Sequence, residues 1–147
     1  MDKITLHHYL LNELRQREAH LLKELEVLRE DVAGDTKSTA GDKHETGRAM
    51  NQLEQERVLG QLQTVRSQLN LVLKIDTSIN VTSASFGALI ESNMGYFFIS
   101  VGIGQLNFEG TNVFCIGQDA PISKFLFGKS TGSFSWNDKE LILYQIS

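Results

Sequence analysis

Two stripes of aliphatic residues in the first half of the chain constrain its fold more than any other feature. The first stripe recurs at alternating spacings of three and four residues, with His7 and Glu18 as polar exceptions, and consists of Ile4, Leu11, Leu14, Leu21, Leu25, Leu28 and Val32. The second stripe has the same spacing and consists of Val58, Leu62, Val65, Leu69 and Val72. This periodicity places each set on one face of a helix, and each face needs a partner helix to exclude water. Because the connection is short, residues 4–33 and 46–74 are predicted to form an antiparallel coiled-coil hairpin.

The composition changes near residue 75. Residues 1–75 hold 23 charged residues and one aromatic residue, whereas residues 76–147 hold 9 charged and 11 aromatic residues. The second segment contains short β-branched and aromatic runs separated by Gly, Asn and Asp, namely SFGALIES, GYFFISVG, TNVFCIG and ELILYQIS. In DAPISKFLFGK, Asp119 can cap a short helix, Pro121 suits its first turn and Gly128 can end it. We therefore predict an α+β protein in which a helical hairpin, residues 1–75, precedes a small antiparallel sheet domain with one short helix, residues 76–147.

Charge, cysteine content and hydropathy argue against several classes of protein. The formal net charge is −4, whereas a protein that binds nucleic acid through a broad surface is usually basic. Cys115 is the single cysteine, so no internal disulfide can form, and its apolar neighbours suggest a core strand position. No apolar run approaches the roughly 20 residues of a membrane-spanning helix, and the first residues lack the apolar block of a signal peptide. We expect a cytoplasmic protein without membrane partners, with His7, His8 and His20 on helix surfaces.

The segment AGDKHETGRAM, residues 40–50, connects the two predicted helices and carries two carboxylates three residues apart. Asp42 and Glu45 fit a capping box, in which Asp42 accepts a hydrogen bond from a first-turn amide and Glu45 reaches back. The same pair can be presented to a partner, since one carboxylate can cap the helix while the other stays exposed. A metal site made of Asp42, His44 and Glu45 alone is disfavoured, because adjacent residues on one loop rarely supply a closed coordination sphere. The spacing leaves the cap and the functional interpretation open.

The order of these features resembles the Gre transcript cleavage factors of bacterial RNA polymerase, over nearly the whole chain. GDKHE, residues 41–45, is similar to the family's Gly-Asp-x-x-Glu at the tip of a helical hairpin. Glu54 falls where the helix after the tip usually carries another Glu. APISKFLFGKSTG, residues 120–132, looks like the family's Ser-Pro-apolar segment with its Leu-Leu-Gly-Lys end. The resemblance implies that residues 76–147 form an FKBP-like domain.

The resemblance also implies a transcription elongation factor rather than an enzyme. Members of the family bind RNA polymerase, insert the hairpin tip into its secondary channel and stimulate the polymerase's own cleavage of backtracked RNA. Asp42 and Glu45 would act in trans, close to the nascent RNA, by helping to hold a catalytic Mg²⁺ of the polymerase, a metal that prefers carboxylate and water oxygens. No cofactor of the chain's own and no small-molecule substrate are implied.

The predicted partner-binding residues lie in both domains. Arg48 follows the tip and can meet an acidic channel wall, although a solvated helix charge explains it equally well. The resemblance points to Pro121, Lys124 and Lys129 in the second domain as docking residues. Phe125 and Phe127 flank Leu126 on the predicted short helix, so at least one of them is expected in the core, and an exposed one would mark a docking patch.

The chain departs from the family pattern around the tip and after the Gly-Lys pair, at Thr46, Gly47, Ala49, Met50 and Ser133. These departures keep a second interpretation open, in which a Gre-like regulator occupies the secondary channel without stimulating cleavage. A coiled-coil adaptor that forms homodimers is a third possibility. A peptidyl-prolyl isomerase is disfavoured, because family members resemble the FKBP fold without its aromatic active-site pocket, and a fold does not carry its function with it.

Overall fold

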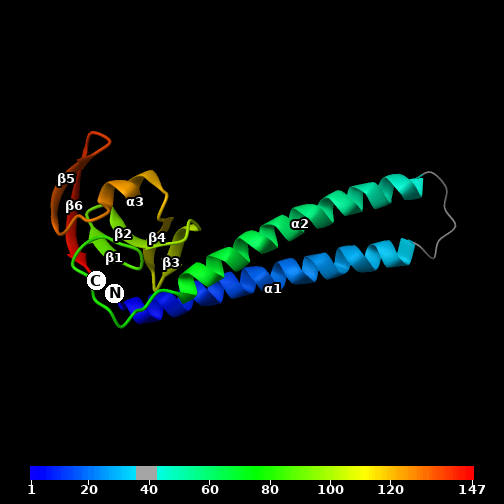
Figure 1. Ribbon diagram of the computed structural model, residues 1–147, viewed down its shortest axis with the longest axis horizontal. Helices are drawn as coiled ribbons and strands as arrows, with labels where there is room; N and C mark the ends of the chain where they lie inside the picture. Colours follow the sequence, from blue (N-terminus) through cyan, green and yellow to red (C-terminus); the bar gives the residue numbers. More distant parts are fainter. Residues whose placement is uncertain (36–42) are drawn as a thin grey trace. The chain divides into compact units, whose positions relative to one another are not determined.

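The computed structural model describes the backbone of residues 1–35 and 43–147 and the side chains of residues 1–33 and 46–147. Two long helices, α1 (Lys3–Asp35) and α2 (Lys43–Leu73), precede six strands and one short helix (Figure 1). The chain divides into two compact units. We call residues 12–70 the hairpin unit, and residues 1–11 together with 71–147 the sheet unit. None of the helices in the described residues has the length and apolarity needed to cross a membrane.

The hairpin unit consists of α1 and α2 packed along their aliphatic stripes. The stripe residues that are buried in this unit are Leu14, Leu21, Leu25, Val58, Leu62, Val65 and Leu69. Ion pairs cross between the helices from Arg66 to Glu18 at 3.1 Å and from Arg57 to Glu24 at 3.0 Å, so residues later in α2 face residues earlier in α1. The predicted antiparallel hairpin is therefore confirmed. Helix α1 continues through Gly34 and ends at Asp35.

The sheet unit contains one six-stranded sheet with the strand order β3-β4-β2-β1-β6-β5. The strands are β1 (Leu89–Ser92), β2 (Gly95–Ser100), β3 (Gly104–Phe108), β4 (Thr111–Gly117), β5 (Gly132–Trp136) and β6 (Lys139–Ile146). The α+β class is confirmed, but the prediction of a purely antiparallel sheet is wrong for one pair. Strands β2 and β4 run parallel, because the β3–β4 hairpin presents its second strand to β2.

Two tight turns set the register of the hairpins at the edges of the sheet. Glu109 and Gly110 both have positive φ between β3 and β4, and Asn137 and Asp138 both have positive φ between β5 and β6. Two successive residues of positive φ form a turn whose twist matches that of the flanking antiparallel strands. Both edge strands, β3 and β5, were missing from the sequence-based prediction.

One face of the sheet and the short helix α3 (Pro121–Leu126) enclose an apolar core. Its buried members are Ala84, Ala88, Ile90, Phe97, Ile99, Leu126, Leu141 and Leu143. Pro121 occupies the first turn of α3, and Gly128 follows the helix with a φ of +79°, both as predicted. The predicted cap is wrong: Ala120 takes the N-cap position, and no side chain caps the helix.

The inner ends of the two long helices belong to the sheet unit. The Nε2 atom of His7 lies 2.7 Å from the carbonyl oxygen of Val72, and the rings of Tyr9 and Phe108 lie 5.3 Å apart. His7 is therefore buried here instead of lying on a helix surface. Ile4 is 48% exposed and does not continue the stripe, because the start of α1 buries Leu6 and Leu10, which lie outside the stripe.

Candidate functional site

The acidic tip, residues 41–45, lies only partly within the described residues. Asp42 falls outside them. Glu45 is the third residue of α2, but its side chain falls outside the described part, as does that of His44. Helix α2 begins at Lys43, at the end of the hairpin unit opposite to Asn70, and the intervening helix is about 40 Å long at a rise of 1.5 Å per residue.

Charged side chains of α1 and α2 meet at Arg57, about three helical turns along α2 from Glu45. The guanidinium of Arg57 donates a 3.0 Å hydrogen bond to Glu54 through Nε and another 3.0 Å bond to Glu24 of α1. These hydrogen bonds from Arg57 hold the pKa of Glu54 below its ordinary value. Glu54, which falls where the resembled family usually carries a Glu after the tip, is thus already paired within the hairpin unit. Arg48 is exposed on the same helix.

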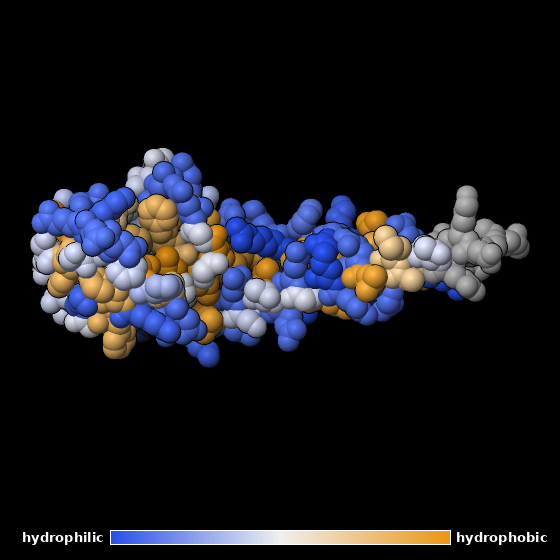
Figure 2. Space-filling view, turned by 90° about the horizontal axis from the view of Figure 1, so that it is seen from above, coloured by the Kyte–Doolittle hydropathy of each residue, from blue (hydrophilic) through white to orange (hydrophobic). Residues whose placement is uncertain are grey.

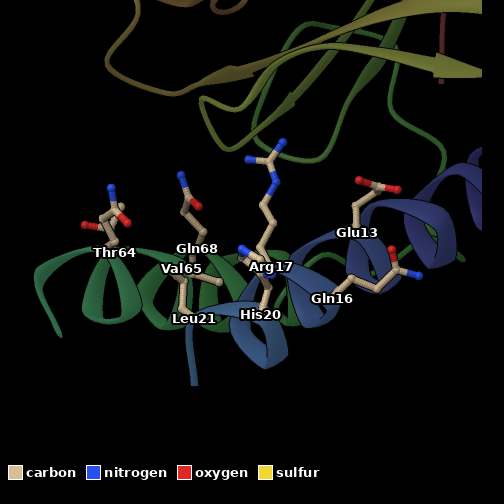
Figure 3. A pocket seen from close by; sticks show the side chains of 9 residues that line it. Glu13, Gln16, Arg17, His20, Leu21, Thr64, Val65 and Gln68 are labelled. Carbon is tan, nitrogen blue, oxygen red and sulfur yellow. The ribbon is translucent and has the colours of Figure 1, made fainter. Parts of the chain in front are cut away.

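A groove of about 550 Å³ lies on the hairpin unit (Figure 3). Leu21 and Val65 of the aliphatic seam form part of its lining, whereas Arg17, Thr64 and Gln68 extend in the same direction from the two helices. The lining combines scattered polar side chains, Glu13 and His20 among them, with the two seam residues. We interpret the groove as the space between flanking side chains of a two-helix coil rather than as a reaction site.

A smaller pocket of about 250 Å³ lies in the sheet unit beside α3. Its lining residues are Ser85, Phe86, Ile99, Gln118, Ser123, Lys124 and Phe127. The Oγ atom of Ser123 is buried and has no hydrogen-bond partner among the described residues. A buried hydroxyl without a partner is costly, so a ligand that hydrogen-bonds to it gains more than it would at an exposed serine. Phe127 is 72% exposed at the same pocket.

This pocket brings some of the predicted docking residues together. Pro121 and Lys124 are exposed on α3, and Lys124 lines the pocket. Lys129 is instead engaged within the unit, where its ammonium group donates to the carbonyl oxygen of Phe125 and lies 4.1 Å from the centre of that ring. Of the two phenylalanines flanking Leu126, Phe125 is half-buried and Phe127 is exposed, in line with the predicted division.

The sequence-based search did not identify Ser123, Gln118 or Phe86. A serine between Ile122 and Lys124 on a short helix gives no signal, because its burial depends on the strands that pack around it. Lys124 and Phe127 were the two lining residues that the sequence had singled out. Among the described side chains, no group of three His, Cys, Asp or Glu residues is arranged to hold a metal ion.

Comparison with protein-family models, with curated proteins and with solved structures finds no match to this chain.

Proposed function

We propose that this chain is a Gre-like transcription factor that binds bacterial RNA polymerase and presents its acidic tip to the secondary channel. The observation that carries the proposal is the hairpin unit itself. Along the chain, α1 (33 residues) ends before Asp42, and α2 (31 residues) begins just after it and includes Glu45 in its first turn. A hairpin of this length is not needed to bury its own narrow seam, but it suits delivery of a few side chains to a recessed site.

The chemistry assigned to the tip depends on its two carboxylates. Asp42 and Glu45 would supply oxygen ligands to a Mg²⁺ of the polymerase, the donor type that this cation prefers. When bound there, Mg²⁺ supplies the Lewis acid and the activated water that RNA hydrolysis requires. The chain contributes charge and position, and the reaction remains the polymerase's own. Arg48 lies one turn of α2 beyond Glu45 and would contact acidic groups of the channel wall.

The sheet unit provides the docking surface in this proposal. The exposed ring of Phe127, the side chain of Lys124 and the hydroxyl of Ser123, which has no hydrogen-bond partner within the described part of the chain, line one pocket. This combination suits a protein segment that offers an apolar side chain next to a hydrogen-bond acceptor or a carboxylate. Docking by the sheet unit would leave the tip carboxylates free to act.

A second candidate is a regulator that occupies the channel without stimulating cleavage. Met50 favours it: this residue stands where the resemblance would place His, and it is 66% exposed on α2. An apolar side chain at this point cannot hold a metal or a water as an imidazole can. The two candidates share the partner and differ only in the effect of the tip.

The test combines two substitutions at the tip, Asp42→Asn and Glu45→Gln. Asn is about as good an N-cap as Asp, and Gln replaces Glu in a capping box, so helix stability should stay within about 1 kcal/mol of the parent. The matched control, Asp31→Asn with Glu56→Gln, removes two exposed carboxylates elsewhere on the hairpin unit. We expect the tip variant to bind polymerase but to lose stimulated cleavage in backtracked complexes, and excess Mg²⁺ to restore part of it.

Each result decides between interpretations. Equal stimulation by the parent and the tip variant would show that Asp42 and Glu45 are structural caps. Absence of stimulation by the parent at every Mg²⁺ concentration, with polymerase binding retained, would favour the channel-occupying regulator. Loss of cleavage in the control as well would trace the effect to net charge rather than to the tip.

A further inference from the structure

The pocket of about 250 Å³ beside α3, which we call the α3 pocket, has apolar side chains in its lining. Ile99 of β2 is 3% exposed and belongs to the core between the sheet and α3. The half-buried Phe86 and the exposed Phe127 also line the pocket. Figure 2 shows the sheet unit from the side on which α3 lies in Figure 1, and apolar surface, in orange and tan, is mixed there with hydrophilic surface. An apolar ligand group would therefore find contacts in this pocket.

The volume of the α3 pocket limits the size of its occupant. A water molecule takes roughly 30 Å³ in the liquid, so 250 Å³ corresponds to about eight waters. Pockets for drug-sized ligands are usually larger, at roughly 300–1,000 Å³. The α3 pocket thus suits one small organic molecule, such as a six-membered ring with a short substituent.

Two successive polar residues of α3 give the pocket a preference for an anionic acceptor. The Oγ atom of Ser123 is buried and has no hydrogen-bond partner among the described residues, so a bound acceptor would offset the cost of burying it. Within the same described part, the ammonium of Lys124 forms no ion pair. Lys124 is also the one charged residue in the pocket lining as described, and Asp119, although close in sequence, is not part of that lining.

The number of donors favours a carboxylate over a larger oxyanion. The described lining offers the Lys124 ammonium, the Ser123 hydroxyl and the side-chain amide of Gln118. A carboxylate has two acceptor oxygens and a single negative charge, which this set can match. A phosphate carries more charge and more acceptor oxygens, and phosphate sites usually supply arginine or several backbone amides.

We propose that the α3 pocket binds a small free carboxylate whose apolar body packs against Ile99, Phe86 and Phe127. The carboxylate would accept hydrogen bonds from the Ser123 hydroxyl and the Lys124 ammonium. This inference goes beyond the proposed function and does not rest on it, because the pocket and its lining belong to this chain alone.

The experiment titrates the isotope-labelled full chain with phenylacetate and follows the backbone amide shifts by NMR. Three matched probes each lack one feature: phenylacetamide lacks the charge, phenethylamine reverses it, and acetate lacks the ring. We expect saturable shifts at the amides of the lining residues. The dissociation constant for phenylacetate should be lower than for each matched probe by about tenfold, because a charge-assisted hydrogen bond and the ring contacts both contribute.

Two variants test the assigned donors. Lys124→Gln removes the charge, and Ser123→Ala removes the hydroxyl, while both new residues are good helix formers. The matched controls, Lys139→Gln and Ser135→Ala, change exposed residues of the same unit. We expect each pocket variant to raise the dissociation constant for phenylacetate by about fivefold and each control to change it by less than about twofold. Thermal unfolding of every variant checks that a loss of affinity is not a loss of fold.

Several results would overturn the inference. Absence of saturable shifts, or shifts away from the pocket, would remove the site. Equal affinity for phenylacetamide or phenethylamine would show that the pocket selects the ring alone, and unchanged affinity in either pocket variant would contradict the assigned donors. Much tighter binding of a peptide that ends in a phenylalanine carboxylate would assign the site to a protein terminus instead of a free acid. No polymerase is present in these measurements, so their failure leaves the proposed function standing, and a chain that binds no polymerase leaves this inference standing.

Discussion

The hairpin unit and the sheet unit bury their apolar residues in different ways. Among the described residues, seven buried hydrophobic side chains lie in the hairpin unit and twenty in the sheet unit. The hairpin unit has one aliphatic seam between two helices. The sheet unit fills both faces of its sheet, because alternate residues of a strand point to opposite faces, and Phe98 is as fully buried as its neighbours Phe97 and Ile99. The long paired helices and the larger apolar core thus belong to separate units.

The amount of buried apolar surface also differs between the two ends of the hairpin unit. Buried hydrophobic residues extend from the inner end of the unit as far as Leu25 and Val58. Toward the tip, the described residues offer a polar contact instead, in which the side-chain amide of Asn51 donates to the carbonyl oxygen of Leu28 at 3.0 Å. Stability is therefore expected to decrease toward the end that carries the proposed activity. The hairpin unit is therefore long at the expense of buried apolar area.

The largest expected effect comes from cutting the chain at residue 76. A fragment of residues 76–147 lacks five hydrophobic side chains buried in the sheet unit, namely Leu6, Leu10, Leu11, Val72 and Ile75. We expect it to lose its cooperative thermal unfolding transition. A control in which residues 12–70 are replaced by a short Gly/Ser linker keeps all five and should unfold cooperatively. A fragment that melts like the parent would show that the inner helix ends contribute little to this unit.

The next prediction concerns a Leu→Ala substitution made once in each unit. Leu141 is fully buried in the sheet unit, so Leu141→Ala should lower the free energy of unfolding by about 3–5 kcal/mol. Leu28 is half-buried near the tip end of the hairpin unit, and Leu28→Ala should cost about 1 kcal/mol because less apolar area is lost. Urea unfolding measures both values. Similar losses at the two positions would contradict the proposed difference in burial.

The sequence predicted the hairpin well and the sheet incompletely. The stripe from Val58 to Val72 is buried throughout, because a seam repeated over several turns has one way to exclude water. Leu6 and Leu10 were missed, since at this end α1 packs within the sheet unit and the heptad spacing no longer applies. Strands β3 and β5 were missed because edge strands such as GQLNF and GSFSW carry polar residues on their exposed side. The pairing of β2 with β4 depends on contacts distant in sequence, which local patterns do not encode.

For the candidate site, the sequence identified candidate residues but not their arrangement in space. The tip carboxylates stay a prediction, since their side chains lie outside the described part. Lys124 was predicted as a docking residue and does line a pocket, whereas the ammonium of Lys129 is engaged by Phe125. Ser123 could not be found from sequence, because the burial of its hydroxyl without a hydrogen-bond partner among the described residues is a property of the folded unit.

A smaller effect is expected from Ser123, whose buried hydroxyl lowers the stability of the sheet unit. Ser123→Ala removes a buried hydroxyl that has no partner among the described residues, so it should raise the free energy of unfolding by about 1 kcal/mol. The same change should weaken polymerase binding, because the pocket loses a hydrogen-bonding group. Thermal unfolding and a binding titration measure the two effects. A variant less stable than the parent would show that the hydroxyl is satisfied in solution.

The smallest effect concerns the exposed ion pairs of the hairpin unit. Hydrogen bonds from Arg57 lower the pKa of Glu54 below its ordinary value of 4.5, so this pair stabilises the folded state above pH 4.5. That contribution is lost as the pH falls through the lowered pKa. Arg57→Gln should reduce the urea midpoint slightly at pH 7 and low salt, and not at all below the lowered pKa or at high salt. The control Arg29→Gln should show neither change, and a difference from the parent that persists in acid would contradict this account.

The central claim, that this chain acts on RNA polymerase through two separate units, is tested most directly by affinity capture with the tagged full chain from its native cell extract. We predict that the parent and the Asp42→Asn, Glu45→Gln variant retain the polymerase subunits equally. A Phe127→Ser variant should retain much less, because the sheet unit then loses the exposed ring at its docking pocket. Failure of the parent to retain any polymerase subunit would contradict the claim.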